Sequence, residues 1–141
     1  MADLTNFESR SGLPECKPEQ LFNFLSDIRN FERFIPMGNI QRWSASEDSC
    51  SFTVSQLGDV IMGIDRKEKF SLVSYKGTAM KSNHFELIVH IDKRANDLAS
   101  VKVSLNAELN PIMKMVASRP VNQFLEMVIS KIENFNCSEV S

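Results

Sequence analysis

Hydrophobic and polar residues alternate with a period of two through most of the middle of the chain. The alternation is clearest over residues 50–55, 60–64, 85–91 and 101–109. A period of two places successive side chains on opposite faces of a β-strand. Short polar turns separate these segments, which favours antiparallel hairpins with one buried and one solvated face. Weaker segments around Trp43, around 73–75 and over 7–14 bring the expected sheet to six or seven strands.

The period lengthens to that of a helix in two places. Residues 18–35 begin with Pro18, which suits a first helical turn, and the pattern bends near residues 27–29. We therefore expect two short helices, 18–27 and 29–35. The second place is 110–135, where Asn110 and Pro111 open one long helix.

The long helix is expected to have two unequal parts. After Arg119 its apolar residues occupy one face and its polar residues the other. Before Arg119 the apolar residues surround the axis, so the first two turns are expected to contact apolar material on more than one side. These residues are Ile112, Met113, Met115 and Val116.

Length and composition are those of one globular domain spanning residues 1–141, with a disordered tail over about 137–141. The net charge of −2 and the scattered lysines and arginines disfavour nucleic acid as a partner. No segment is apolar enough for a transmembrane helix, and the first residues do not resemble a secretory leader. The cysteines, Cys16, Cys50 and Cys137, are odd in number and widely spaced, so we expect no disulfide framework and a cytoplasmic location. The oligomeric state is left open.

Several segments resemble a known superfamily. Residues 21–31, followed by Phe34, Ile35 and Pro36, look like the helix pair of bacterial polyketide cyclase/lipid-transport-like proteins, and residues 110–115 and 123–126 look like their closing helix. The chain thus resembles the START-like, Bet v 1-like (SRPBCC) superfamily over nearly its whole length. The resemblance implies an α+β helix-grip fold: two short helices after the first strand, and a curved antiparallel sheet wrapped around a long C-terminal helix. It implies a cavity without specifying a reaction.

The titratable residues give little support for catalysis or metal binding. His84 and His90 share the solvent-facing parity of their strand and stand about 20 Å apart, too far to share one ion. Cys50 alternates with apolar residues, as a small buried side chain does. Tyr75 and Asp65 are the few groups that could face inward as an acid or base, and a salt bridge is the commoner role for Asp65. We predict no catalytic residue, no metal ligand and no cofactor.

The predicted function is non-enzymatic binding of a small hydrophobic molecule, lipid-like or polycyclic, between the sheet and the 112–120 part of the last helix. Adaptable Met and aromatic side chains would line the cavity, unless they fill the core completely. Two alternatives remain: a cyclase- or hydrolase-type enzyme using the same cavity, and a co-chaperone-like protein-interaction domain. The predicted lining residues are Trp43, Phe52, Val54, Met62, Tyr75, Phe85, Leu87, Met113, Val116 and Phe124.

Overall fold

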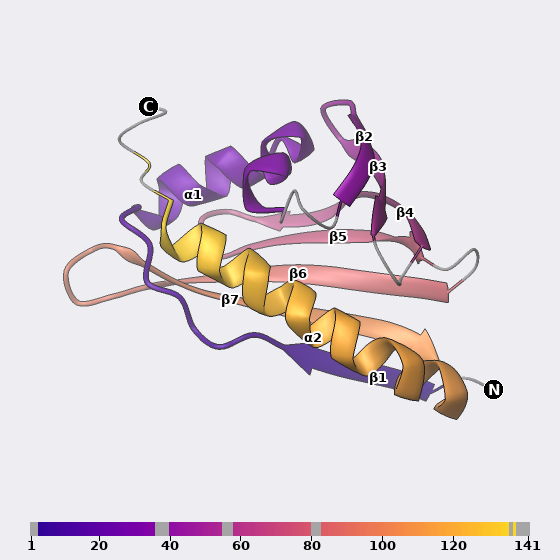
Figure 1. Ribbon diagram of the computed structural model, residues 1–141. Coiled ribbons are helices and arrows are strands. Elements are labelled where there is room, and N and C mark those ends of the chain that lie inside the picture. Colours follow the sequence, from indigo (N-terminus) through magenta and orange to yellow (C-terminus); the bar gives the residue numbers. More distant parts are fainter. Residues whose placement is uncertain (1–2, 36–39, 55–57, 80–82, 136, 138–141) are drawn as a thin grey trace.

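The computed structural model describes the chain except for residues 1–2, 36–39, 55–57, 80–82, 136 and 138–141. Its elements follow one another as a strand, two short helices, six strands and a long helix (Figure 1). They are β1 (Asp3–Glu8), α1 (Pro18–Leu25), η1 (Ile28–Phe34), β2 (Ile40–Ala45), β3 (Ser49–Val54), β4 (Gly58–Glu68), β5 (Leu72–Ala79), β6 (Asn83–Lys93), β7 (Ala99–Leu109) and α2 (Pro111–Glu133).

The seven strands form one curved antiparallel sheet in the order β1-β7-β6-β5-β4-β3-β2. The strand after the first two helices therefore lies at one edge, and β1 closes the other edge against β7. The helix α2 crosses one face of this sheet, while α1 and η1 cover its far end (Figure 1). This arrangement confirms the predicted helix-grip fold. The prediction that residues 1–141 make a single domain stays a prediction.

Local chemistry explains where the helices begin. Pro18 opens α1, and the amide of Lys17 donates to Gln20 Oε1 at 2.9 Å. The Asp27 carboxylate caps η1 by accepting from the Arg29 amide at 3.0 Å. Asn110 caps α2 by accepting from the Met113 amide at 2.8 Å. The two short helices predicted over 18–35 are thus present as α1 and the 3₁₀ helix η1.

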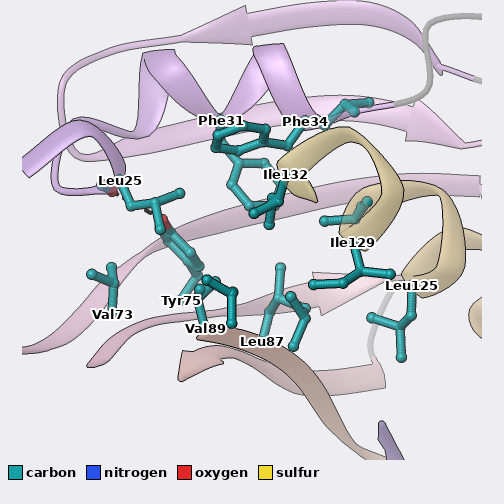
Figure 2. Close-up of a cluster of buried hydrophobic side chains, with 14 of the residues drawn as sticks. Leu25, Phe31, Phe34, Val73, Tyr75, Leu87, Val89, Leu125, Ile129 and Ile132 are labelled. Carbon is teal, nitrogen blue, oxygen red and sulfur yellow. Dashed lines mark hydrogen bonds between the residues drawn. The ribbon is translucent and has the colours of Figure 1, made fainter. Parts of the chain in front are cut away.

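Many of the largest fully buried side chains gather between the second half of α2, the two short helices and the middle of the sheet, a region called the dense core below (Figure 2). The Tyr75 ring packs edge-on against Phe31 with centroids 5.3 Å apart, and its hydroxyl donates to the Leu25 carbonyl at 2.9 Å. The largest side chains of this region are fully buried: Leu25, Phe31, Phe34, Tyr75, Leu87, Leu125, Ile129 and Ile132.

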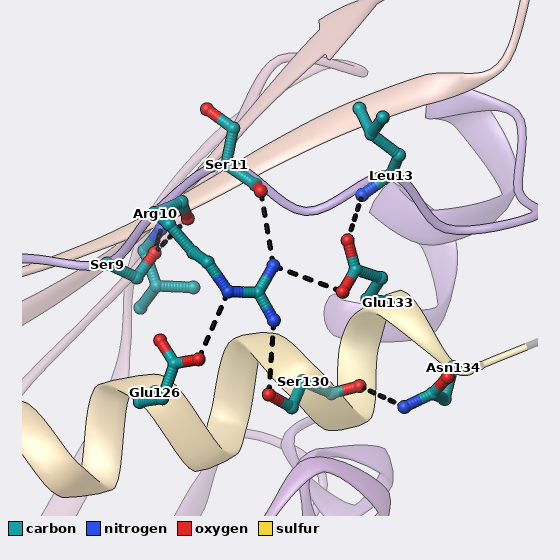
Figure 3. A network of polar contacts seen from close by, with 9 residues as sticks. Ser9, Arg10, Ser11, Leu13, Glu126, Ser130, Glu133 and Asn134 are labelled. Atoms are coloured by element: carbon teal, nitrogen blue, oxygen red, sulfur yellow. Dashed lines mark hydrogen bonds and ion pairs between the residues drawn. The ribbon is translucent and has the colours of Figure 1, made fainter.

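A polar network fixes the second half of α2 to the connector that follows β1 (Figure 3). The Arg10 guanidinium contacts Glu126 Oε1 at 3.1 Å, Glu133 Oε1 at 3.0 Å and Ser130 Oγ at 3.2 Å. Glu133 also accepts from the Leu13 amide at 3.3 Å. These partly exposed contacts fix the position of the helix more than they stabilise the fold.

A disulfide joins Cys16, just before α1, to Cys137, just after α2. Both residues are buried, and 121 positions separate them in the sequence. The expectation that the cysteines form no disulfide was therefore wrong. Sequence spacing could not reveal the pair, because only the folded chain brings its two ends together. The rest of the tail predicted for 137–141 lies outside the described residues, and Cys137 itself is packed into the core.

Candidate functional site

An apolar cavity of about 60 Å³ lies between the sheet and α2, beside the dense core. Strands β3 to β7 and one side of α2 supply its walls. Asn83 is the one polar side chain among the described residues that line it. The lining residues are Phe52, Val54, Val60, Met62, Ala79, Asn83, Phe85, Leu87, Leu105, Ala107, Leu109, Ala117, Val121 and Phe124.

Strand register explains how the lining side chains meet. On the inner face Phe52 pairs with Val60 across β3 and β4, and Phe85 pairs with Ala107 across β6 and β7. Directly opposite residues of an antiparallel pair point to the same face of the sheet. Their alternation along each strand therefore gives a continuous apolar wall.

Small side chains explain why space remains here. Ala79 on β5, Ala107 on β7 and Ala117 on α2 all border the cavity. Equivalent inward positions in the dense core carry large side chains such as Tyr75 and Ile129. Protein interiors are close-packed, so a cluster of alanines contributed by separate elements leaves a void unless a neighbour fills it.

Six of the ten predicted site residues lie in this lining: Phe52, Val54, Met62, Phe85, Leu87 and Phe124. The other four lie elsewhere. Trp43 stacks on the lining residue Phe52 with ring centroids 5.5 Å apart, and Tyr75 belongs to the dense core. Met113 packs against the core, while Val116 is 57% exposed. That any of these residues binds a ligand stays a prediction.

The first turns of α2 are more exposed to solvent than the sequence predicted. Ile112 is 72% exposed and Met115 is 81% exposed, so these side chains meet solvent and not a second apolar surface. Only Met113 and Ala117 turn toward the sheet on this part of the helix. The cavity consequently lies further along α2, against Ala117, Val121 and Phe124, than the apolar residues at the helix start indicated.

Sequence reasoning missed eight lining residues. The sequence indicated some of them, since the alternation over 101–109 already placed Leu105, Ala107 and Leu109 on the inner face. The alternation gave no reason to choose small inward residues over large ones as cavity-lining residues. The missed residues are Val60, Ala79, Asn83, Leu105, Ala107, Leu109, Ala117 and Val121.

The buried titratable groups near the cavity are held neutral. Burial raises the pKa of the Cys50 thiol to about 12. Burial, and to a lesser degree the neighbouring Cys50, also raises the pKa of the Tyr75 phenol above its ordinary value. Asp65, the other group considered for proton transfer, pairs with Lys76 Nζ at 3.5 Å. None of these three residues lines the cavity.

Comparisons with known proteins define the class of fold. No protein-family model and no curated protein matches this sequence. Solved structures do match. Norcoclaurine synthase from Thalictrum flavum is 7% identical with a TM-score of 0.69, over 94% of this chain and 86% of that one. A START superfamily protein from Mycobacterium smegmatis is 13% identical with a TM-score of 0.62, over 92% and 97%.

Ara h 8.0201 is a third structure of this kind, 12% identical with a TM-score of 0.57, over 92% of this chain and 98% of that one. At such identities the likeness concerns the fold alone. The protein has the helix-grip fold of the START-like, Bet v 1-like superfamily, so the resemblance noted in the sequence is confirmed at that level. Within the described residues, no helix is long and apolar enough to cross a membrane.

Proposed function

We propose that the protein binds a small hydrophobic molecule, lipid-like or polycyclic, between the sheet and α2, without chemical turnover. The observation that carries the proposal is the apolar cavity, whose described lining holds one polar side chain, Asn83. Binding would come from removing apolar surface from water, at about 25 cal/mol per Å².

The size of the cavity bears on how a ligand enters. At about 60 Å³ it is smaller than the roughly 300 Å³ from which ordinary ligand sites begin. A ligand therefore has to widen it. Met62 has a flexible side chain that can repack, and Phe124 is only half-buried at the helix side. We expect ligand binding to displace these two side chains.

The enzyme alternative has less support. One structure of the same fold is a synthase, so the fold itself is compatible with catalysis. Proton transfer, however, needs a titratable group within reach of the ligand. The described lining contains none, and the two candidates from the sequence are engaged elsewhere: Tyr75 with the Leu25 carbonyl and Asp65 with Lys76.

The cytoplasmic location predicted from the sequence stays a prediction. Its premise was that the cysteines are unpaired, and the Cys16–Cys137 disulfide removes that premise. Such bonds persist mainly in oxidising compartments. The disulfide therefore weighs against a reducing cytoplasm as the place where the protein acts.

Native mass spectrometry of the freshly purified protein, with a thermal-shift panel of lipids, sterols and aromatic polycycles, tests the proposal. We expect a bound mass that organic extraction removes, or a rise in Tm with one ligand class. A protein without bound mass whose Tm no member of the panel raises would contradict it.

A cavity-filling variant locates the binding site. Ala117→Leu adds three carbon atoms inside the cavity and should weaken binding of a fluorescent apolar probe, such as N-phenylnaphthylamine, by about tenfold or more. Ser118→Leu makes a comparable addition one residue further along α2, outside the lining, and serves as the control. Equal affinity of the two variants, both folded by circular dichroism, would place the ligand elsewhere.

A further inference from the structure

The first two turns of α2 present apolar side chains to solvent. Ile112, Met115 and Val116 are 72%, 81% and 57% exposed. Their spacing of three and four residues places them on one face of the helix, which we call the Ile112 face. Met113 and Ala117 lie on the opposite face, toward the sheet. The Ile112 face lies at the end of the molecule away from α1 and η1 (Figure 1).

The charge on the Ile112 face itself is positive, although the protein as a whole is acidic. Between Leu109 and Glu126 the chain carries Lys114 and Arg119 and no carboxylate. Both cations are exposed, and in the described part of the chain neither takes part in an ion pair. Arg119 lies one turn beyond Met115 and Val116, on the same side of the helix. Lys114, two residues from Ile112, lies on the opposite side.

We propose that the Ile112 face, with Arg119, docks on the surface of an anionic lipid bilayer. Apolar side chains beside a cationic side chain suit a helix that lies in the headgroup region of such a bilayer. The face is too small for a stable protein interface, which buries about 800 Å² on each partner. Three side chains suffice for shallow insertion into lipid, so charge and area both favour a bilayer over a second copy.

Docking in this way would bring the candidate cavity to the membrane surface. Ala117 and Val121 line the cavity from the opposite side of the same helix, within three turns of Ile112. Leu109, which directly precedes the helix, lines it as well. The bilayer is then a source or acceptor of the apolar ligand. This last step rests on the proposed function, whereas the docking surface does not.

Vesicle flotation tests the docking surface. The wild-type protein should float with vesicles in which about a third of the lipid is phosphatidylglycerol, with about fivefold preference over phosphatidylcholine alone. The double variant Ile112→Ser/Met115→Ser should lose about tenfold or more of this binding. Ile61→Ser is the control, since Ile61 is 60% exposed on β4 and lies outside the Ile112 face. It should bind as the wild type does.

Charge variants separate the electrostatic contribution to vesicle binding from the apolar one. Arg119→Glu should abolish the preference for anionic vesicles, and high salt should weaken wild-type binding to them. Lys114→Glu, on the opposite side of the helix, makes the same change of charge and should have less effect. Wild-type protein that stays unbound with anionic vesicles would overturn the proposal. Equal loss in the Ile61→Ser control would overturn it as well. A dimer in solution that the Ile112→Ser/Met115→Ser variant dissociates would assign the face to a second copy instead.

Probe binding without vesicles distinguishes this proposal from the proposed function. The Ile112→Ser/Met115→Ser variant should keep wild-type affinity for N-phenylnaphthylamine, which also shows that it is folded. Vesicle binding without probe binding would refute the cavity and leave the docking surface standing. Probe binding without vesicle binding would support the cavity and refute the docking surface.

Discussion

At the scale of single residues, Tyr75 shows how a polar group is accommodated in this core. It is the only tyrosine of the chain, it is fully buried, and its hydroxyl donates to the Leu25 carbonyl. Tyr75→Phe leaves that carbonyl without its donor and should lower the free energy of unfolding by about 1–2 kcal/mol, measured by urea denaturation. Probe affinity should not change, because Tyr75 does not line the cavity. A large loss of affinity would instead support the ligand contact predicted from the sequence.

Burial of the Cys50 thiol makes the stability of the folded protein depend on pH, and it fixes the direction of that dependence. The pKa of its thiol rises from 9.0 to about 12 in the folded protein, so the unfolded chain loses this proton first as pH increases. Its contribution to stability is complete below pH 9.0 and is lost progressively as pH rises toward 12.

We therefore expect the Tm of the wild type to fall above pH 9 more steeply than that of Cys50→Ala. Differential scanning calorimetry across that range measures both slopes. The Tm of Cys50→Ala will still fall somewhat as pH rises, because Tyr75 is also held neutral by burial. Parallel curves for the two proteins would show that the Cys50 proton does not contribute.

At the scale of elements, α2 performs two tasks along its length. Its second half is buried against the sheet and held by the Arg10 network, whereas its first turns are exposed. Ile129→Ala should lower the free energy of unfolding by about 2–5 kcal/mol, since it opens a cavity in the core. Ile112→Ala should change it by less than about 0.5 kcal/mol. Urea denaturation of this matched pair measures both, and similar losses would mean that the helix start is packed against the protein.

At the scale of the whole molecule, the disulfide closes the chain on itself. It joins residues 121 positions apart and ties the segment after α2 to the one before α1. Reduction, or Cys16→Ala/Cys137→Ala, should lower the free energy of unfolding by about 2–5 kcal/mol. Thermal unfolding with and without a phosphine reductant measures the effect. Cys50→Ala should keep the full sensitivity to reductant, and a wild-type Tm that reduction leaves unchanged would contradict the role assigned to this bond.

The sequence was informative wherever structure depends on near neighbours. The period of two over 101–109 predicts β7 and its inner face, and the change of period after Asn110 predicts α2. It was misleading at the start of α2. There the apolar residues predicted contacts on several sides, but a helix lying on a sheet can bury only one side. Ile112, Met115 and Val116, three of the four residues in that pattern, therefore face solvent.

By itself the sequence determined the order and type of the elements and the apolar face of each one, because side-chain periodicity is a property of a few consecutive residues. Only the tertiary structure decided which faces meet. It brought Ala79, Ala107 and Ala117 together to leave a cavity, paired Cys16 with Cys137, and left Ile112 and Met115 in solvent. Each of these outcomes depends on residues far apart in the chain, whose proximity arises from strand register and helix placement and leaves no local pattern.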